Sequence, residues 1–210
     1  MLKRSKEAIT VHLKENLLLY ILVTLVLALG IAVGSIAAKG LNVEQKENLI
    51  GFLNMFFNTS DISRIDKTIL FKTSLINNLK TALLIYVLGV TIIGIPIILL
   101  ILLIRGFILG FTVGFLINEM ALKGFVFSVF SLLPQNLFIL PAILSMGVSA
   151  TSFCLILIKR RINSQNINVF QQFVGYTIFY FILLLLLFIG ILIETYVTPV
   201  FIKMIIPYIE

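Results

Sequence analysis

The sequence has few of the residues that enzyme and metal chemistry need. Its 210 residues include one cysteine (Cys154), one histidine (His12) and no tryptophan, and only 12% are charged. A single cysteine excludes an intramolecular disulfide, and one histidine without an acidic or thiol cluster offers no set of metal ligands. The sequence has no Ser-His-Asp, His-Glu-x-x-His or Cys-His pattern, so hydrolytic chemistry has no residues to use. We therefore predict no enzyme activity, no cofactor and no metal.

Apolar residues take the place of the missing charges. Hydrophobic residues make up 60% of the chain, whereas soluble domains have about 45–50% apolar and about 25% charged residues. The mean hydropathy of +1.15 agrees. The net charge of +7 is spread in islands between apolar runs, which excludes the continuous basic face of a nucleic-acid-binding protein. This composition predicts an integral membrane protein whose surroundings are the lipid bilayer.

The charge-free runs predict where the chain crosses the bilayer, because a spanning helix needs about 20 apolar residues. The first run is long for the apolar region of a signal peptide, so we interpret it as a retained anchor. We predict one all-α polytopic membrane domain over 1–210 with five transmembrane helices. Their predicted ranges are 17–38, 81–104, 106–122, 137–158 and 174–193.

A break is predicted in the longest charge-free run, 124–158, which is too long for one span and too short for two. Pro134 removes a backbone donor and biases the residue before it away from helical geometry, and the polar residues Gln135 and Asn136 follow. Irregular backbone in lipid must be covered by protein or open to water. Three readings stay open: a structural kink, an outward-facing partner pocket and a solute site at a broken helix. Residues 125–133 are read as a half-buried segment before the break.

The only sizeable hydrophilic segment is the loop 39–80 between the first two predicted spans. Asn42 followed by Gln45 resembles a capping box, and apolar residues recur behind it at helical spacing. Amphipathic helices of this kind lie on the membrane surface or pack on a partner. The loop is too small to have a core of its own. Its phenylalanines and the residues of the predicted break are therefore our candidate partner surface: Phe52, Phe56, Phe57, Pro134, Gln135 and Asn136.

Three glycines at four-residue spacing mark one face of the third predicted span: Gly106, Gly110 and Gly114. Helices in lipid approach each other most closely where small residues line the contact. We predict that this glycine stripe packs against a neighbouring span of the same chain. The alternative is a seam between two copies of the chain in a homodimer.

Basic residues give the predicted orientation of the chain in the membrane. With the N-terminus inside, the lysines and arginines divide equally between the two sides, so their count decides nothing. Two features favour a cytoplasmic N-terminus: the basic residues ahead of the first span, and the Lys159-Arg160-Arg161 cluster in a short loop. The loop 39–80 and the C-terminus then lie outside.

Several segments together resemble the stage II sporulation protein M family. Their order covers essentially the whole chain, and the Pro-Gln-Asn motif and the C-terminal segment are the specific parts. The segments are HLKEN at 12–16, Gly94-Ile95-Pro96, GFTVGFLIN at 110–118, LPQNL at 133–137 with Pro141, and ETYVTPV at 194–200.

The resemblance implies a five-span protein in the septal membrane of the mother cell of endospore-forming bacteria, with the N-terminus in the cytoplasm and the C-terminus outside. It implies a scaffold that works with stage II sporulation proteins D and P, which cut peptidoglycan. The expected function is to recruit and position these hydrolases for wall remodelling during engulfment. The alternative is a small transporter or permease component with a substrate site at the broken helix. A transporter needs a polar path through the bilayer, and the few polar residues at mid-span favour the scaffold.

Overall fold

The computed structural model of the protein describes residues 16–58, 66–163 and 168–209. Within these residues the chain forms helices and turns and no strand, so the predicted all-α class is confirmed. The elements are α2 (Leu17–Lys39), α3 (Val43–Asn58), α4 (Lys67–Gly89), α5 (Gly94–Asn163), α6 (Val169–Leu192), the π-helix η2 (Ile193–Val197) and α7 (Thr198–Ile209).

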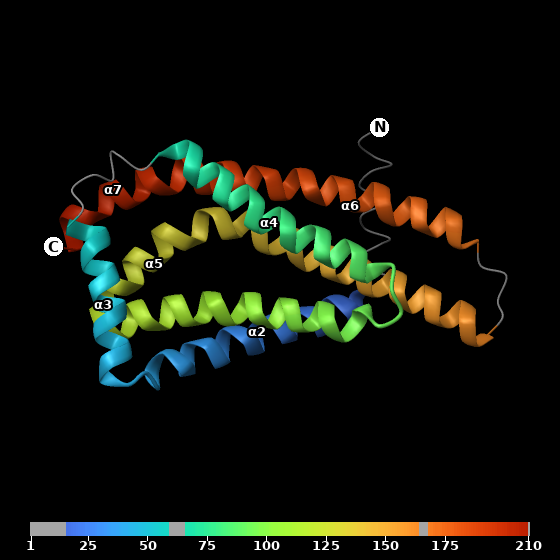
Figure 1. Ribbon diagram of the computed structural model, residues 1–210, viewed down its shortest axis with the longest axis horizontal. Coiled ribbons are helices and arrows are strands. Elements are labelled where there is room, and N and C mark those ends of the chain that lie inside the picture. Colours follow the sequence, from blue (N-terminus) through green and yellow to red (C-terminus); the bar gives the residue numbers. More distant parts are fainter. Residues whose placement is uncertain (1–15, 59–65, 164–167, 210) are drawn as a thin grey trace.

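Three helical stretches are long and apolar enough to cross a membrane: Leu17–Lys39, Gly94–Arg160 and Val169–Ile205. The second stretch is not one straight rod. Ala121 has φ 49° and ψ −124°, which interrupts the helical geometry, and the chain turns back there (Figure 1). We call 94–120 the first leg of α5 and 122–163 its second leg. The predicted membrane protein is confirmed by these helices, whereas the number of spans stays a prediction.

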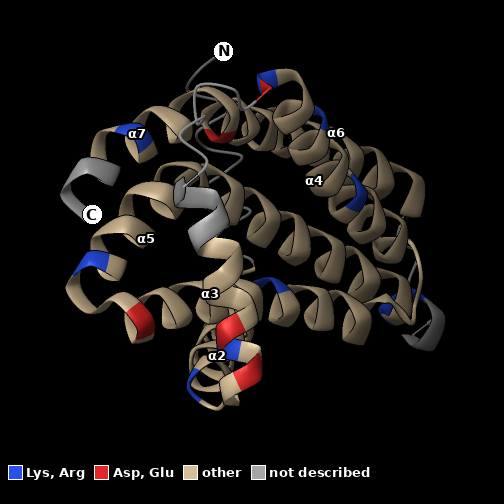
Figure 2. Cartoon of the chain, turned by 60° about the vertical axis from the view of Figure 1, so that its left-hand side comes forward, with Lys and Arg blue, Asp and Glu red and all other residues tan. Residues whose placement is uncertain are grey.

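The helices form an elongated bundle. α2, α4, the two legs of α5 and α6 lie along its long axis and run alternately in opposite directions (Figure 1). We call the end that holds the α4–α5 turn and the start of α6 the turn end. The opposite end, which we call the α3 end, holds the reversal at Ala121 and α7, and α3 runs across it (Figure 1). α3 carries both acidic and basic residues, whereas long stretches of the other helices carry none (Figure 2).

The main core lies between α4, both legs of α5 and α6, and Val23 of α2 joins it. Tyr176 of α6 stacks on Phe153 with ring centroids 5.0 Å apart and on Tyr86 at 5.2 Å. The hydroxyl of Tyr176 donates to the carbonyl oxygen of Tyr86 at 3.1 Å, and that of Tyr180 donates to the carbonyl oxygen of Ala82. The tyrosines therefore fill apolar space and satisfy their own hydroxyl groups on the backbone of α4.

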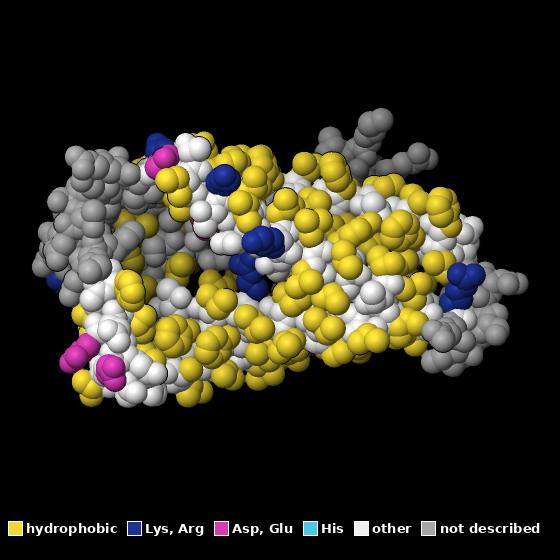
Figure 3. All heavy atoms as spheres, viewed as in Figure 1, with side chains coloured by type: hydrophobic (Ala, Val, Ile, Leu, Met, Phe, Trp, Pro, Cys, Tyr) yellow, Lys and Arg dark blue, Asp and Glu magenta, His cyan; other side chains and the backbone are white. Residues whose placement is uncertain are grey.

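The outer surface of the bundle is strongly apolar, as the space-filling view shows (Figure 3). Large hydrophobic side chains on every long helix face outward, which a soluble protein of this size avoids. In a bilayer the same side chains meet lipid tails. Examples are Leu18 on α2, Leu83 on α4, Leu100 and Ile108 on α5 and Phe181 on α6.

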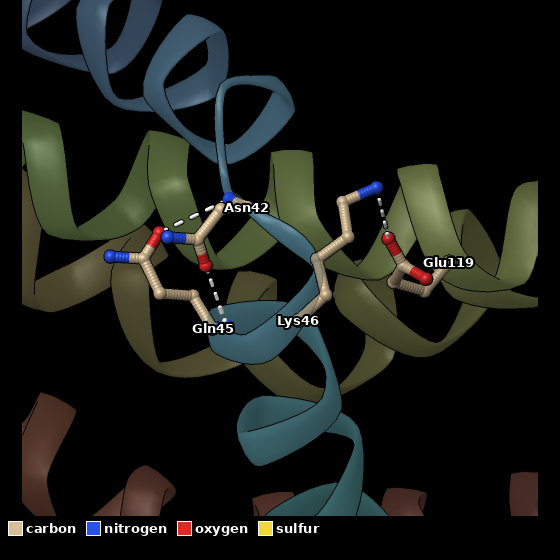
Figure 4. A network of polar contacts seen from close by, with 4 residues as sticks. All are labelled: Asn42, Gln45, Lys46 and Glu119. Carbon is tan, nitrogen blue, oxygen red and sulfur yellow. Dashed lines mark hydrogen bonds and ion pairs between the residues drawn. The ribbon is translucent and has the colours of Figure 1, made fainter.

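α3 is held by local polar contacts. The Asn42 side chain accepts a hydrogen bond from the backbone N–H of Gln45 at 2.9 Å, and the Gln45 side chain accepts one from the N–H of Asn42 at 3.2 Å (Figure 4). The predicted capping box is therefore confirmed. Lys46, one residue further on, forms a 3.2 Å ion pair with Glu119 of the first leg of α5 (Figure 4). α3 is thus tied to the bundle near its start.

The structure corrects the predicted helix over 81–104. α4 ends at Gly89 and α5 begins at Gly94, with a turn between them. Pro96 falls in the first turn of α5, where its missing N–H costs nothing. The thiol of Cys154 lies 3.2 Å from the carbonyl oxygen of Gly89 and 3.1 Å from that of Thr91, so it caps the end of α4. This turn was not predicted because its residues, Val90–Ile93, are almost all apolar and continue the charge-free run.

Two further boundaries are corrected. The expected separation between Arg105 and Gly106 is absent, because the helix continues through both residues. The predicted break at Pro134–Asn136 is wrong as well, since the second leg stays helical there and residues 125–133 belong to it. Asn136 donates through Nδ2 to the carbonyl oxygen of Leu132 at 2.8 Å. Pro134 itself leaves the carbonyl of Phe130, four residues earlier, without its helical N–H donor, and the Asn136 bond does not replace that donor.

The alternation of the helices gives a direct test of orientation. We expect single cysteines at Ile92 and Gln171, both exposed at the turn end, to resist an impermeant thiol reagent in intact cells. A cysteine at Glu47 on α3 should react. Cys154→Ser is the suitable background, because a hydroxyl can keep the hydrogen bonds to the end of α4. Permeabilised cells should make position 92 reactive, whereas a residue at the centre of a span would stay protected.

Candidate functional site: a polar chain beside an apolar cavity

Polar side chains line the inner face of α4. Ser74 and Asn78, four residues apart, are only 5% and 4% exposed. Thr81 follows three residues later. Residues three and four apart share one face of a helix, so α4 presents a polar stripe to the helices that it packs against. Buried polar groups of this kind require hydrogen-bond partners.

The polar stripe connects two opposite charges. Arg105, in the first leg of α5, donates through Nη2 to Asn78 Oδ1 at 2.9 Å and to Thr81 Oγ1 at 3.1 Å. Asn78 Nδ2 lies 3.3 Å from Ser74 Oγ and donates to it. The Ser74 hydroxyl donates in turn to Glu194 Oε2. We call Arg105, Asn78, Ser74 and Glu194 the polar chain; it joins α5, α4 and η2.

The polar chain neutralises two charges inside an apolar protein. Among the described residues no ion pair within 4 Å joins Arg105 to Glu194, although their charges interact. Asn78 and Ser74 carry the contact between them, with every hydrogen bond oriented from the cation toward the anion. Bonds arranged in this way polarise and strengthen one another. Ionisable residues within apolar helices are costly, and they mark functional sites where they occur.

The predicted span limits left both charged residues outside the helices. Glu194 follows the predicted span 174–193, and the structure places it half-buried, where it accepts a hydrogen bond from Ser74. Arg105 falls between the predicted spans 81–104 and 106–122, and the structure places it within α5. The signal that identifies the site is the spacing of Ser74, Asn78 and Thr81 on one face of α4. The site was not predicted from this spacing because Ser74 and Asn78 fall within 39–80, which was predicted to be a hydrophilic loop.

η2 positions the carboxylate of the polar chain. The π-helix is a wider turn between α6 and α7, and such segments occur frequently at functional sites. Just before it, Gly190 packs so tightly on the second leg of α5 that a Cβ there would lie 2.6 Å from Ile139 Cγ1. Just after it, the Thr198 hydroxyl donates to Gln135 Oε1 at 3.2 Å. These contacts fix η2 against α5 on both sides of Glu194.

A cavity of about 680 Å³ opens beside the polar chain, toward the α3 end. Its hollow is visible in the space-filling view next to α3 (Figure 3). Side chains from α3, α4, both legs of α5, η2 and α7 line it. Most of this lining is apolar, as in ordinary ligand sites. The polar lining residues are few: Thr112, Ser131, Gln135, Glu194 and Thr198.

The predicted partner residues are only partly brought together. Phe52 of α3 and Gln135 of α5 line the same cavity, and Phe52 is also 71% exposed. Pro134 lies in the helix beside Gln135, and Asn136 is bonded to the backbone. The side chains of Phe56 and Phe57 lie outside the described part of the chain.

The predicted glycine stripe lies against α2 of the same chain. A Cβ on Gly106 would lie 2.3 Å from the carbonyl oxygen of Leu27, and a Cβ on Gly110 would lie 2.0 Å from that of Ile31. α2 contributes glycines of its own to the contact: a Cβ on Gly34 would lie 2.1 Å from the carbonyl oxygen of Phe107. The two backbones therefore touch, and this contact leaves no room for any side chain.

The family of the protein follows from its sequence. The family model of Stage II sporulation protein M matches residues 23–199, which include the whole polar chain. The chain belongs to this family. The resemblance drawn from its segments is thereby confirmed, and the protein is a sporulation-related membrane protein. No curated protein and no solved structure matches the chain.

Proposed function

We propose that this member of the Stage II sporulation protein M family is a membrane scaffold that recruits and positions peptidoglycan hydrolases during engulfment. Family membership supports a role in sporulation at a membrane. The observation that carries the proposal is Phe52, a large aromatic side chain that is 71% exposed on a helix at one end of the bundle. Aromatic residues of this kind tend to dominate the binding energy of an interface.

The position of α3 supports this role. Its capping box orders the start of the helix, and the ion pair between Lys46 and Glu119 joins that end to the bundle. Among the described residues α3 otherwise makes few contacts with the other helices, so most of its surface is available to a partner.

The proposed partners are stage II sporulation proteins D and P, in the septal membrane of the mother cell. In this arrangement the turn end and the N-terminus face the cytoplasm, and the α3 end and the C-terminus face the cell wall. α3 then lies on the side of the membrane where wall hydrolases work.

The transporter alternative relied on a substrate site at a broken helix. Residues 134–136 are helical, so the feature that favoured this alternative is absent from the second leg of α5. The scaffold is therefore the function that we propose.

Phe52→Ser tests the proposed docking surface. We expect the variant to accumulate in the membrane at a normal level, because the side chain is mostly exposed. The amount of hydrolase that co-purifies from sporulating cells should fall at least about tenfold, as expected for loss of an aromatic anchor. Phe170→Ser is the matched control, since Phe170 is 75% exposed on α6 at the turn end. Equal recovery of the hydrolases with both variants would contradict the proposal.

A further inference from the structure

We propose that the cavity beside the polar chain binds one phospholipid with an amine head group, whose ammonium group meets Glu194 while an acyl chain lies along the phenylalanine wall. We define the phenylalanine wall as Phe111, Phe115 and Phe127. The proposal goes beyond the scaffold function and does not depend on it.

The chemistry of Glu194 selects the head group. Ser74 occupies one carboxylate oxygen, Oε2, whereas Oε1 has no hydrogen-bond partner among the described residues. Glu194 also lines the cavity. An ionised carboxylate only accepts hydrogen bonds, so the group that meets Oε1 must be a donor. A primary ammonium group supplies three N–H donors and a positive charge, and it makes the stronger, charge-assisted kind of hydrogen bond.

The polar chain holds the Glu194 carboxylate in one orientation before a ligand binds. The hydrogen bond from Ser74 fixes the orientation of Glu194, and Asn78 and Arg105 hold Ser74 in turn. The site therefore needs little reorganisation when an ammonium group arrives. The neighbouring amide of Gln135 is fixed as well, because its oxygen accepts a hydrogen bond from Thr198.

The phenylalanine wall suits a hydrocarbon chain. The rings of Phe111 and Phe115 are nearly parallel, with centroids 6.5 Å apart and an interplanar angle of 5°. Phe127 faces the cavity from the second leg of α5. An acyl chain that packs against these rings gains dispersion contacts with them. Other apolar side chains, among them Leu116, Leu132 and Ile202, line the rest of the cavity.

The size of the cavity suits a small ligand or part of a lipid molecule, since its volume is about 680 Å³. A cavity of this volume falls in the ordinary range for small-molecule sites, about 300–1,000 Å³.

Lipid retention by the purified full-length protein tests the proposal. The protein is incubated with an equimolar mixture of phosphatidylethanolamine, phosphatidylcholine and phosphatidylglycerol, and native mass spectrometry then counts the lipids that stay bound. We expect one phosphatidylethanolamine per chain in clear excess over the other two. Phosphatidylcholine separates charge from hydrogen bonding, because its quaternary ammonium has no N–H donor.

Three variants decide between the outcomes. Glu194→Gln keeps an acceptor for Ser74 and removes the charge, and we expect it to lower phosphatidylethanolamine retention about tenfold. Glu119→Gln is the matched control, because Glu119 pairs with Lys46 and does not line the cavity. Thr112→Phe should abolish retention, because Thr112 lines the cavity and the larger side chain would fill it. Among the described residues the Thr112 hydroxyl bonds only to the carbonyl oxygen of Ile108 in its own helix, so its loss breaks no contact between helices.

The proposal is overturned if the wild-type protein retains the three lipids equally, or if Glu194→Gln or Thr112→Phe retains phosphatidylethanolamine as the wild type does. A second copy of the chain in the spectrum in place of the lipid also overturns it. A failure of Phe52→Ser to affect hydrolase recovery would contradict the scaffold and leave the lipid result standing. The two proposals therefore fail separately.

Discussion

Gly110→Leu is expected to abolish accumulation of the protein in the membrane. A Cβ at this position would lie 2.0 Å from the carbonyl oxygen of Ile31 and 2.7 Å from its Cα. Both are backbone atoms of a helix, so they move only if α2 moves as a whole. Overpacking of a core costs about 1–3 kcal/mol even where side chains can give way, and here α2 must separate from α5. Immunoblots of membrane fractions measure the level, and thermal unfolding in detergent measures the stability.

Gly175 provides the matched control. It lies within α6, and a Cβ there would meet no atom within 4 Å. Gly175→Leu should therefore leave accumulation unchanged, and Gly175→Ala should be neutral or slightly stabilising because alanine favours a helix by about 1 kcal/mol over glycine. Gly110→Ala should already lower the level. Normal levels of Gly110→Leu would show that α2 and α5 do not meet along the glycine stripe.

The glycine stripe shows how far a sequence pattern reaches. The spacing of Gly106, Gly110 and Gly114 predicts a close contact, because each glycine falls on one face of a helix. The pattern does not name the partner helix. Gly30 and Gly34 of α2 also stand four residues apart and meet the stripe, and this second pattern is the signal that the sequence reasoning missed.

Local motifs were predictable and long-range contacts were not. The capping box of Asn42 and Gln45 depends on residues three apart, so the sequence alone contains it. The contact between Ser74 and Glu194 joins residues 120 positions apart. No local pattern marks those two residues as neighbours. The polar chain therefore became visible only when the packing of α4, α5 and η2 was known.

One error came from applying a rule for single helices to a packed bundle. Pro134 was expected to break its helix, yet the second leg of α5 stays helical through it. The end of the third predicted span, at 122, lies beside the reversal of the chain at Ala121. No local pattern marks Ala121 itself, because alanine rarely adopts a positive φ such as its 49°.

The span limits failed for a different reason. Charge-free runs measure apolarity, and both the turn Val90–Ile93 and the helices on either side of it are apolar. Conversely, α4 carries three lysines and was assigned largely to a loop, although its inner face is built into the bundle. Charge-free runs therefore mark the ends of helices only where a helix has no polar residues that pair inside the protein.

Arg105→Leu is expected to destabilise the protein by about 3 kcal/mol, the cost of leaving one partner of a buried charged network alone. The substitution removes the donor to Asn78 and Thr81 and leaves the charge of Glu194 without its counterpart. Thermal unfolding of the purified protein in detergent measures the change. Lys80→Leu is the matched control: Lys80 is exposed on α4, so its loss should change stability by no more than about 0.5 kcal/mol.

The double variant Arg105→Leu with Glu194→Gln tests whether the two charges stabilise each other or whether each side chain contributes to stability on its own. If the two charges stabilise each other through Asn78 and Ser74, removing both should cost less than the sum of the single losses. Residues in one hydrogen-bonded network typically show coupling of about 0.5–3 kcal/mol. Asn78 and Ser74 keep their mutual hydrogen bond in the double variant, and the amide oxygen introduced by Glu194→Gln can still accept from Ser74. Strictly additive losses would show that Arg105 and Glu194 act independently, and that the polar chain does not transmit their interaction.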